Sequence, residues 1–223
     1  MNGAVAIVLA AGRGERMDAT IPKALMTLGG TPLVARAVER AFAAASVSSV
    51  VVVAPRGWED AVRAALVEAS AVDVVVAGGA TRQASVWAGL SAVPPEVVRV
   101  ICHDAARALA SPELFERTLE ALEGWDGVVP VLPMVDTVKR VHDGMIEGTE
   151  PRGSLAVAQT PQAFTAMALR DAHGRAKRDG FEGTDDAVLL ERAGYRVRAI
   201  EGERTNLKIT TPQDIRVAEV LAG

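Results

Sequence analysis

Short runs of Val, Ile and Ala alternate along the chain with longer segments whose apolar residues recur every three or four positions. The short runs are typical of buried strands, and the longer segments are typical of helices that pack one face on a core. Strands are expected at 4–9, 49–54, 72–77, 97–102, 127–131, 196–200 and 206–209. Helices are expected at 33–44, 58–69, 81–92, 112–123, 166–178, 185–193 and from 211 onward.

Strands that alternate with helices at this spacing predict βαβ units with right-handed crossovers. The expected fold class is therefore α/β and Rossmann-like, with a mostly parallel, twisted sheet flanked by helices. The chain has 223 residues, no internal repeat and no linker-like stretch. A single domain spanning 1–223 is the expected organisation.

The alternation of strands and helices breaks after Pro133. Segments 136–141 and 145–148 flank an Asp143-Gly144 turn, which predicts a β-hairpin. Only half of its alternating positions are apolar, so we expect an arm at 134–157 that lies outside the main core. An extended hairpin of this kind suggests exchange with a second subunit, and a homodimer is our hypothesis.

Composition narrows the range of partners. The formal charge is −4 and the basic residues are scattered among acids, which argues against a nucleic-acid or membrane-surface binder. Cys102 is the only cysteine, so neither an intrachain disulfide nor a cysteine-based zinc site is expected. Without a basic leader or an apolar stretch long enough to span a bilayer, a cytoplasmic enzyme is the expectation.

A glycine loop follows the first strand, at 10–17. Gly12 and Gly14 allow a sharp turn and expose backbone N–H groups that suit anionic oxygens. Met17 stands where a dinucleotide-binding loop has its third glycine, and no P-loop motif occurs, so neither of those sites fits. Arg13, Arg16 and Lys23 lie in the same segment and together favour a triphosphate, although each alone is compatible with a solvated surface charge.

Asp104 follows the strand expected at 97–102, where a carboxylate is well placed to hold Mg²⁺ against a phosphate. The alternative is a turn or helix cap. His103 is expected to be structural. Lys208, far along the chain, is a second candidate cation for the same sheet edge. For Thr184-Asp185-Asp186 we prefer a helix N-cap with first-turn acids over a metal-binding acidic pair.

Together these segments resemble the 2-C-methyl-D-erythritol 4-phosphate cytidylyltransferases. The matching segments occur in family order over nearly the whole chain, namely 10–17, 22–23, 78–79 with Arg82 and Ser85, 103–107, 136–139, 160–162, 184–186 and 206–210. The glycine loop with Pro-Lys is shared by many sugar-nucleotidyltransferases, whereas 103–107 and 206–210 are much more specific. Two departures, Ala24 for a frequent Gln and Ala108 for a common Pro, bear on fine substrate preference and not on the chemistry.

The resemblance implies a nucleotidyltransferase fold and a Mg²⁺-dependent homodimer. It implies transfer of CMP from CTP to methylerythritol phosphate by in-line attack on the α-phosphate, which gives 4-diphosphocytidyl-2-C-methyl-D-erythritol and pyrophosphate. Ribitol 5-phosphate as the acceptor is the alternative. More remote alternatives are a uridylyl-, guanylyl- or adenylyltransferase and a non-catalytic nucleotide-binding protein.

The resemblance also assigns roles to residues of this chain. The implied catalytic cations are Arg16, Lys23 and Lys208. The implied nucleotide-binding residues are Ala10, Ala11, Gly12, Gly14, Gly79, Arg82, Ser85 and Asp104, and Asp104 is also the implied metal ligand. The implied acceptor-binding residues are Arg107, Thr137, Arg152, Thr160 and Thr184.

Overall fold

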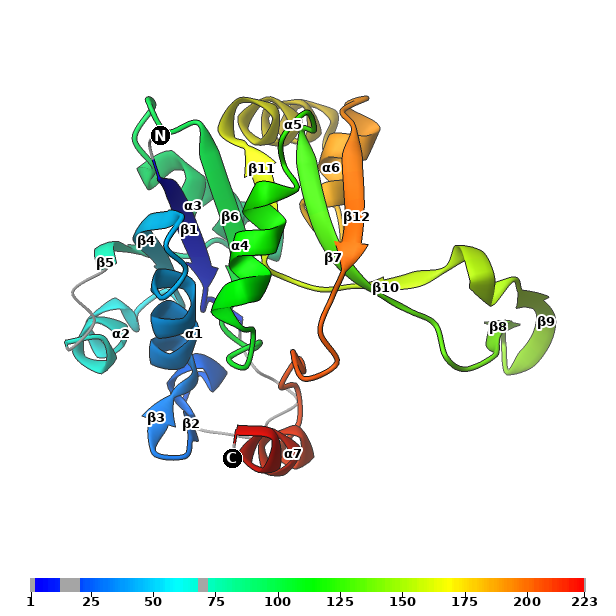
Figure 1. Ribbon diagram of the computed structural model, residues 1–223, viewed down its shortest axis with the longest axis horizontal. Helices are drawn as coiled ribbons and strands as arrows, with labels where there is room; N and C mark the ends of the chain where they lie inside the picture. The colour runs from blue at the N-terminus through cyan, green and yellow to red at the C-terminus, as the bar shows by residue number, and fades with distance from the viewer. Residues whose placement is uncertain (1–2, 13–20, 68–71, 223) are drawn as a thin grey trace.

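The computed structural model describes residues 3–12, 21–67 and 72–222, and in these ranges eight strands form one central sheet (Figure 1). Its path runs β10-β7-β11-β6-β1-β4-β5, and β12 pairs with β7 on the other side. The strands are β1 (Ala4–Leu9), β4 (Val47–Ala54), β5 (Val72–Ala77), β6 (Arg99–Asp104), β7 (Gly127–Pro133), β10 (Ala156–Ala158), β11 (Gln162–Thr165) and β12 (Val197–Glu201).

Most neighbouring strands are parallel, as predicted. β5, β4, β1 and β6 run in one direction, and β12 is parallel to β7. The exceptions are β10 and β11, which were not predicted. β11 is antiparallel to both β6 and β7, and β10 is antiparallel to the last residues of β7. One edge of β7 therefore pairs with β11 at its start and with β10 at its end.

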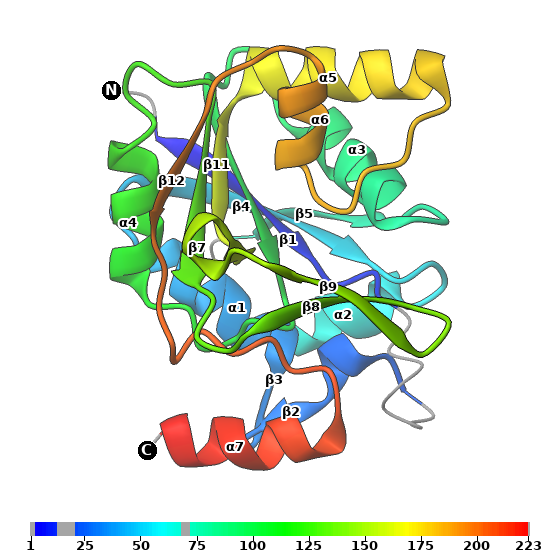
Figure 2. The same cartoon turned by 90° about the vertical axis from the view of Figure 1, so that its right-hand side faces the viewer.

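Helices cover both faces of the sheet. The helices are α1 (Leu33–Phe42), α2 (Glu59–Ala65), α3 (Arg82–Ala92), α4 (Pro112–Glu120), α5 (Ala166–Asp179), α6 (Ala187–Arg192) and α7 (Pro212–Ala222). In β1, alternate side chains point to opposite faces, because successive residues of a strand do so. Ala4, Ala6 and Val8 join the core under α1, α2 and α4, while Val5, Ile7 and Leu9 join the core under α3, α5 and α6. Figure 2 shows α4 across the sheet from α3 and α5.

Helix starts follow the expected capping chemistry. Ser111 Oγ accepts a hydrogen bond from Leu114 N at 3.0 Å, with Pro112 in the first turn. At the start of α7, Asp214 N donates to Thr211 Oγ1 at 3.3 Å and Thr211 N donates to Asp214 Oδ2 at 2.8 Å, which is a reciprocal capping arrangement. In the described ranges, no helix combines the length and the apolar character needed to cross a membrane.

Besides the two cores on the faces of the sheet, a small third core lies below the sheet in the view of Figure 1. It joins Leu28, Leu33, Ala108, Ile209 and Ala218, so that α7 packs against a two-stranded hairpin of β2 (Thr27–Leu28) and β3 (Thr31–Pro32). A 3₁₀ turn, η2 (Lys23–Leu25), precedes this hairpin. The strand predicted at 206–209 is wrong: this segment is irregular, and Ile209 N makes a single backbone bond to Ala106 O at 2.8 Å.

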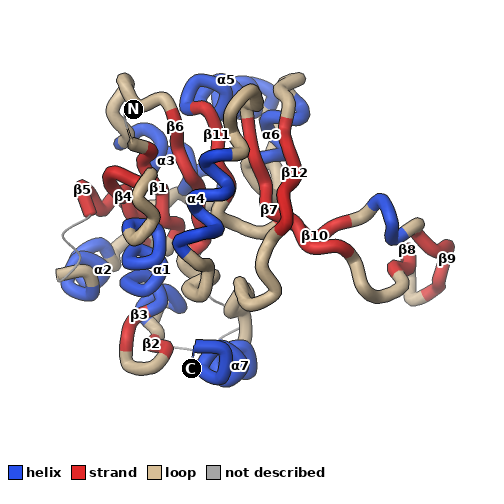
Figure 3. Tube along the Cα trace, viewed as in Figure 1, coloured by secondary structure: helices blue, strands red, loops and turns tan. Residues whose placement is uncertain are grey.

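The predicted hairpin extends from the body of the molecule (Figures 1 and 3). It consists of β8 (Val138–His142) and β9 (Met145–Glu150), paired antiparallel, and a 3₁₀ turn η3 (Arg152–Ser154) leads back to β10. Asp143 and Gly144 both have positive φ, which suits a tight hairpin turn. Its apolar side chains at Val141, Met145 and Ile146 are mostly exposed.

Helix α3 packs so closely on the sheet that Gly89 has no room for a methyl group. A Cβ there would lie 2.5 Å from Ile7 Cγ2 and 2.8 Å from Val53 Cγ2. We expect Gly89→Ala to lower the free energy of unfolding by about 1–3 kcal/mol through overpacking, despite alanine's better helix propensity. Urea denaturation measures the difference.

Gly174 in α5 is the matched control. The nearest atom to its added Cβ would be Arg178 Nη1 at 3.7 Å, which is an ordinary contact. Gly174→Ala should therefore raise the free energy of unfolding by about 0.5–1 kcal/mol. Equal effects of the two substitutions would contradict the close packing of α3.

Candidate active site

A cavity of about 560 Å³ opens at the carboxyl ends of β1 and β6. Parallel strands present their following loops at this edge, which is where α/β proteins bind ligands. The cavity is lined by all the described residues predicted to be catalytic or nucleotide-binding, namely Ala10, Ala11, Gly12, Lys23, Gly79, Arg82, Ser85, Asp104 and Lys208. Gly14 and Arg16, along with Arg13 and Met17, lie outside the described residues.

Asp104, the last residue of β6, is the centre of the charged groups. Its carboxylate accepts hydrogen bonds from Lys208 Nζ at 2.7 Å and from Arg82 Nε at 3.4 Å. Its backbone N donates to Thr160 Oγ1 at 3.0 Å. Burial alone would raise the pKa of Asp104, but Arg82 and Lys208 outweigh it and hold that pKa well below its ordinary value. Asp104 is therefore ionised at neutral pH.

Arg82 lies between two acids. Its Nη1 donates to Asp186 Oδ2 at 2.8 Å, and Asp186 Oδ1 lies 3.1 Å from His173 Nε2. Burial opposes the charge of Arg82, yet Asp186 and Asp104 raise its pKa above the ordinary value. In the same way Arg82 and His173 outweigh burial and lower the pKa of Asp186. Arg82 is thus a charged, partly buried group fixed from both sides.

The expected helix N-cap with first-turn acids at Thr184-Asp185-Asp186 is correct only for the capping bond, because α6 begins at Ala187 and neither acid lies in its first turn. Asp185 Oδ1 accepts Val188 N at 3.0 Å, whereas Asp186 makes no capping bond with its side chain and is buried against Arg82. Sequence reasoning missed Asp186 and His173 as supports of the site. Asp186 lies 104 residues from Arg82 in sequence, so no local pattern signals their contact.

The two lysines reach the cavity from different segments. Lys23 follows Pro22 in η2, and its Nζ donates to Ile209 O at 3.0 Å, within the segment that carries Lys208. Lys23, Arg82 and Lys208 therefore converge on one cavity. Asp104 is the single acidic residue among the described residues lining it. Such an excess of cations suits a polyanionic ligand.

The glycines near the start of α3 allow close approach of the backbone. A Cβ at Gly78 would overlap Ala11, and one at Gly79 would overlap Ala84. Gly79 N donates to Ser85 Oγ at 3.1 Å, and Ser85 Oγ donates to Thr81 O at 2.8 Å. This part of the cavity is a rigid, neutral wall next to the charged part. Of the two family departures, Ala24 lines the cavity and Ala108 belongs to the third core.

The predicted acceptor-binding residues are dispersed in one chain. Thr160 is buried beside Asp104, and Arg107 is buried with Nη1 on Asn206 O at 2.8 Å and Nη2 on Ala158 O at 3.2 Å. Thr184 is exposed ahead of α6. Thr137 and Arg152 are exposed on the arm, away from the body (Figure 1), and Arg152 Nη1 donates to Val135 O at 2.6 Å. Their roles stay predictions.

Asp104 is the candidate metal ligand. The described residues contain no group of three or more His, Cys, Asp or Glu that could hold a metal by itself. Mg²⁺, however, is commonly held by one or two carboxylates together with substrate phosphates and water. A single ionised carboxylate facing a cation-rich cavity fits that second mode of binding.

Comparison with known proteins is consistent across the whole chain. The family model of 2-C-methyl-D-erythritol 4-phosphate cytidylyltransferase matches residues 4–223. The chain is 47% identical over 219 residues to the protein of that name from Rhodococcus jostii, covering 97% of this chain and 94% of the relative. It is 41% identical over 221 residues to the one from Synechocystis sp., covering 97% and 96%.

Solved structures agree. The crystal structure of 2-C-methyl-D-erythritol 4-phosphate cytidylyltransferase from Thermus thermophilus matches with a TM-score of 0.81 at 37% identity, covering 97% of each chain. The 4-diphosphocytidyl-2C-methyl-D-erythritol synthase of Anaerococcus prevotii matches with a TM-score of 0.87 at 30% identity, covering 99% of this chain and 96% of that one.

His103 generates a pH prediction. It is fully buried, with Nδ1 3.2 Å from Thr160 Oγ1 and its ring 4.9 Å from that of Phe115, which agrees with a structural role. Burial lowers its pKa from 6.5 to about 4. The unfolded chain therefore binds the proton more readily, so the free energy of unfolding should fall, by on the order of 3 kcal/mol, as pH drops from 6.5 to 4.

Urea denaturation between pH 7 and 4 measures this loss. The matched variant is His103→Asn, which keeps a polar atom near Thr160 but has no group that titrates in this range. It should lose the part of the slope between pH 6.5 and 4 that comes from His103. A variant with the wild-type slope would show that His103 is not the group responsible.

Proposed function

The chain belongs to the 2-C-methyl-D-erythritol 4-phosphate cytidylyltransferase family, and we propose that the cavity at Asp104 is its active site. Its reaction is the transfer of CMP from CTP to methylerythritol phosphate, which releases pyrophosphate. The observation that carries the assignment of the cavity is the Asp104 carboxylate held between Lys208 and Arg82, beside the start of the glycine loop. Ribitol 5-phosphate is the less favoured acceptor.

The transfer reaction does not need a general base. An oxygen of the acceptor's phosphate attacks the α-phosphorus of CTP, and the bond from that phosphorus to the bridging oxygen of pyrophosphate breaks. A phosphomonoester has a second pKa of about 6, so the nucleophile is already largely ionised at neutral pH. No histidine or cysteine occurs among the described residues lining the cavity. The lining therefore agrees with a reaction that needs no general base.

The main obstacle is the repulsion between two anions and the charge gained by the leaving pyrophosphate. Fixed cations reduce both by positioning and electrostatic stabilisation. Lys23 and Lys208 are our candidates for this role, with Arg16 as a third. Arg82, neutralised by Asp104 and Asp186, instead keeps Asp104 ionised.

We place Mg²⁺ at Asp104 when CTP is bound. The ion would supply further neutralisation of the phosphate oxygens and hold them in one orientation. Asp104 would be its protein ligand, while Lys208 remains close enough to contact the phosphates.

The arm, residues 134–157, is our candidate for the contact with a second copy of the chain in a homodimer. The exposed Val141, Met145 and Ile146 would be covered by such a contact. Thr137 and Arg152 would then reach the partner's cavity and bind the acceptor there. This arrangement explains why both residues lie on an arm that extends away from the body (Figure 1) and do not line the cavity of their own chain.

Pyrophosphate release tests the function and the lysines together. Purified protein with Mg²⁺ is assayed with CTP, UTP, ATP and GTP against methylerythritol phosphate and ribitol 5-phosphate. We expect turnover with CTP and methylerythritol phosphate. Lys23→Ala or Lys208→Ala should lower kcat/KM by roughly 10²-fold, the scale of losing one preorganised stabilising group.

Two outcomes would change the assignment. Preference for ribitol phosphate would keep the mechanism and change the acceptor. Near-wild-type turnover by folded Lys208→Ala protein would remove Lys208 from the reaction. Far-UV circular dichroism of each variant separates these outcomes from misfolding.

Arg152→Ala tests the arm. It should raise the KM for methylerythritol phosphate while leaving the KM for CTP close to wild type, because the arm contacts only the acceptor in this arrangement. If only CTP binding weakens, the placement of the arm is wrong.

Co-expression with Lys208→Ala protein then decides between a contact within one chain and a contact across the dimer. In a mixed dimer, one cavity combines an intact Lys208 with the partner's intact Arg152. Random pairing should therefore give about a quarter of the wild-type number of intact sites from two defective chains. A contact within one chain gives no such recovery.

A further inference from the structure

The segment that carries Lys208, residues 202–210, reaches the cavity without belonging to the sheet. Backbone bonds hold it near its ends, where Gly202 N donates to Val131 O at 2.9 Å and Ile209 N donates to Ala106 O at 2.8 Å. The side chain of Lys208 is 44% exposed, so its own packing does little to fix its position. Something between the two ends must hold the backbone in place.

Gln159 supplies most of that hold. It is 4% exposed, and its side-chain amide bonds both backbone groups of Glu203: Glu203 N donates to Oε1 at 3.0 Å, and Nε2 donates to Glu203 O at 2.8 Å. This two-bond pattern is the one that a neighbouring strand would provide. Gln159 thus replaces the missing sheet partner of the segment.

Asn206 supplies the second hold, two residues before Lys208. It is fully buried, and its Nδ2 donates to Thr160 O at 2.9 Å and to Gln159 Oε1 at 3.4 Å. Its carbonyl accepts Arg107 Nη1 at 2.8 Å. We call Gln159 and Asn206 the amide clamp.

The amide clamp is linked to both partners of the central ion pair, to Asp104 through Thr160 and to Lys208 through the backbone at Asn206. The carbonyl oxygen of Thr160 accepts a hydrogen bond from Asn206 Nδ2, and its hydroxyl oxygen accepts one from Asp104 N. The dipeptide Gln159-Thr160 therefore fixes the backbone of Asp104 and the backbone beside Lys208 against one another. The 2.7 Å contact from Lys208 Nζ to Asp104 depends on both backbones keeping their places.

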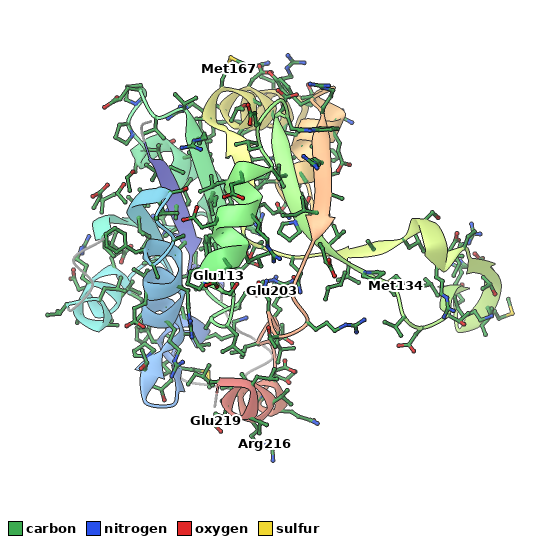
Figure 4. The ribbon with its side chains drawn as sticks, in the orientation of Figure 1. Glu113, Met134, Met167, Glu203, Arg216 and Glu219 are labelled. Atoms are coloured by element: carbon green, nitrogen blue, oxygen red, sulfur yellow. The ribbon has the colours of Figure 1, made fainter. Side chains whose placement is uncertain are left out.

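The amide clamp also adjoins the root of the arm. Gln159 directly follows β10, and its N donates to Pro130 O at 2.8 Å in β7, the strand that leads into the arm. On the other side, the Glu203 carboxylate accepts hydrogen bonds from Ser111 Oγ at 2.6 Å, at the N-cap of α4, and from Arg117 Nη2 at 3.2 Å, within α4. Figure 4 shows Glu203 below α4 and Met134 where the arm begins.

We propose that Gln159 and Asn206 are positioning residues for the transfer reaction, which hold Lys208 at Asp104 without contacting the substrates. The proposal rests on the proposed function of the cavity and of Lys208. It gives the reaction two determinants that carry no charge and do not line the cavity.

Gln159→Met, which keeps the length and removes the amide, is the test. We expect kcat/KM for CTP to fall roughly 10- to 100-fold in folded protein, because small misplacements of a catalytic group cost rates of this order. In the Lys208→Ala background the same substitution should cause little further loss, because the amide clamp acts through Lys208.

Thr118→Val is the matched control. Thr118 is fully buried on α4, outside the cavity lining, and its hydroxyl donates to Leu114 O at 2.6 Å. Its loss should lower the melting temperature and leave kcat/KM unchanged. If Gln159 has a positioning role, Gln159→Met lowers kcat/KM even in assays run well below the melting temperature of the variant. Thr118→Val has no such effect under the same conditions.

Each failure has its own signature. Wild-type protein without turnover of CTP and methylerythritol phosphate would overturn the function. If the wild type is active and Gln159→Met has the same kcat/KM, the amide clamp alone is overturned. The same holds if the kcat/KM losses of Gln159→Met and Lys208→Ala multiply in the double variant. If Gln159→Met does not fold, Gln159→Glu serves instead, because it keeps the acceptor for Glu203 N and loses the donor to Glu203 O.

Discussion

The ionised carboxylate of Asp104, set largely out of water, is the constraint on which the rest of the site depends. A buried charge is tolerated only when it is paired and hydrogen-bonded. Lys208 and Arg82 provide the pairing, Thr160 holds the backbone, and Asp186 in turn balances Arg82. Because of this requirement, segment 202–210, helix α3 and the loop before α6 all place a charged side chain near the end of β6.

How far the sequence predicts the fold depends on whether an element is specified locally. β1 and β5 match their expected ranges, because their β-branched runs are bounded by glycines and loops. β11 has four residues and is placed by antiparallel partners on both sides, so its own residues carry little signal. In 206–209 the alternation of Leu207 and Ile209 imitates a strand, but the alternating apolar residues pack in or against the third core and the segment has no strand beside it.

The same division applies to the site. Lys23 and Asp104 could be found because charged residues after strands or glycine-rich turns are informative at an α/β sheet edge. Lys208 is indicated by the family resemblance of segment 206–210, because the strand expected there does not form. Gln159, His173 and Asp186 could not be found, because each acts on a group brought near only by folding. Gln159 is 44 residues from Glu203, and nothing around either residue indicates that they meet. Supporting residues of this kind become visible only when the contacts are known.

The third core has a consequence for any truncated or fused version of the protein. Helix α7 contributes nothing to the cavity lining, yet its Ala218 shares that core with Leu33, which does line the cavity, and with Ile209 next to Lys208. Removing α7 would expose Leu28 and Ile209 and free one wall of the cavity from its support. A stop codon at position 212 would therefore disable the enzyme while deleting none of its catalytic groups.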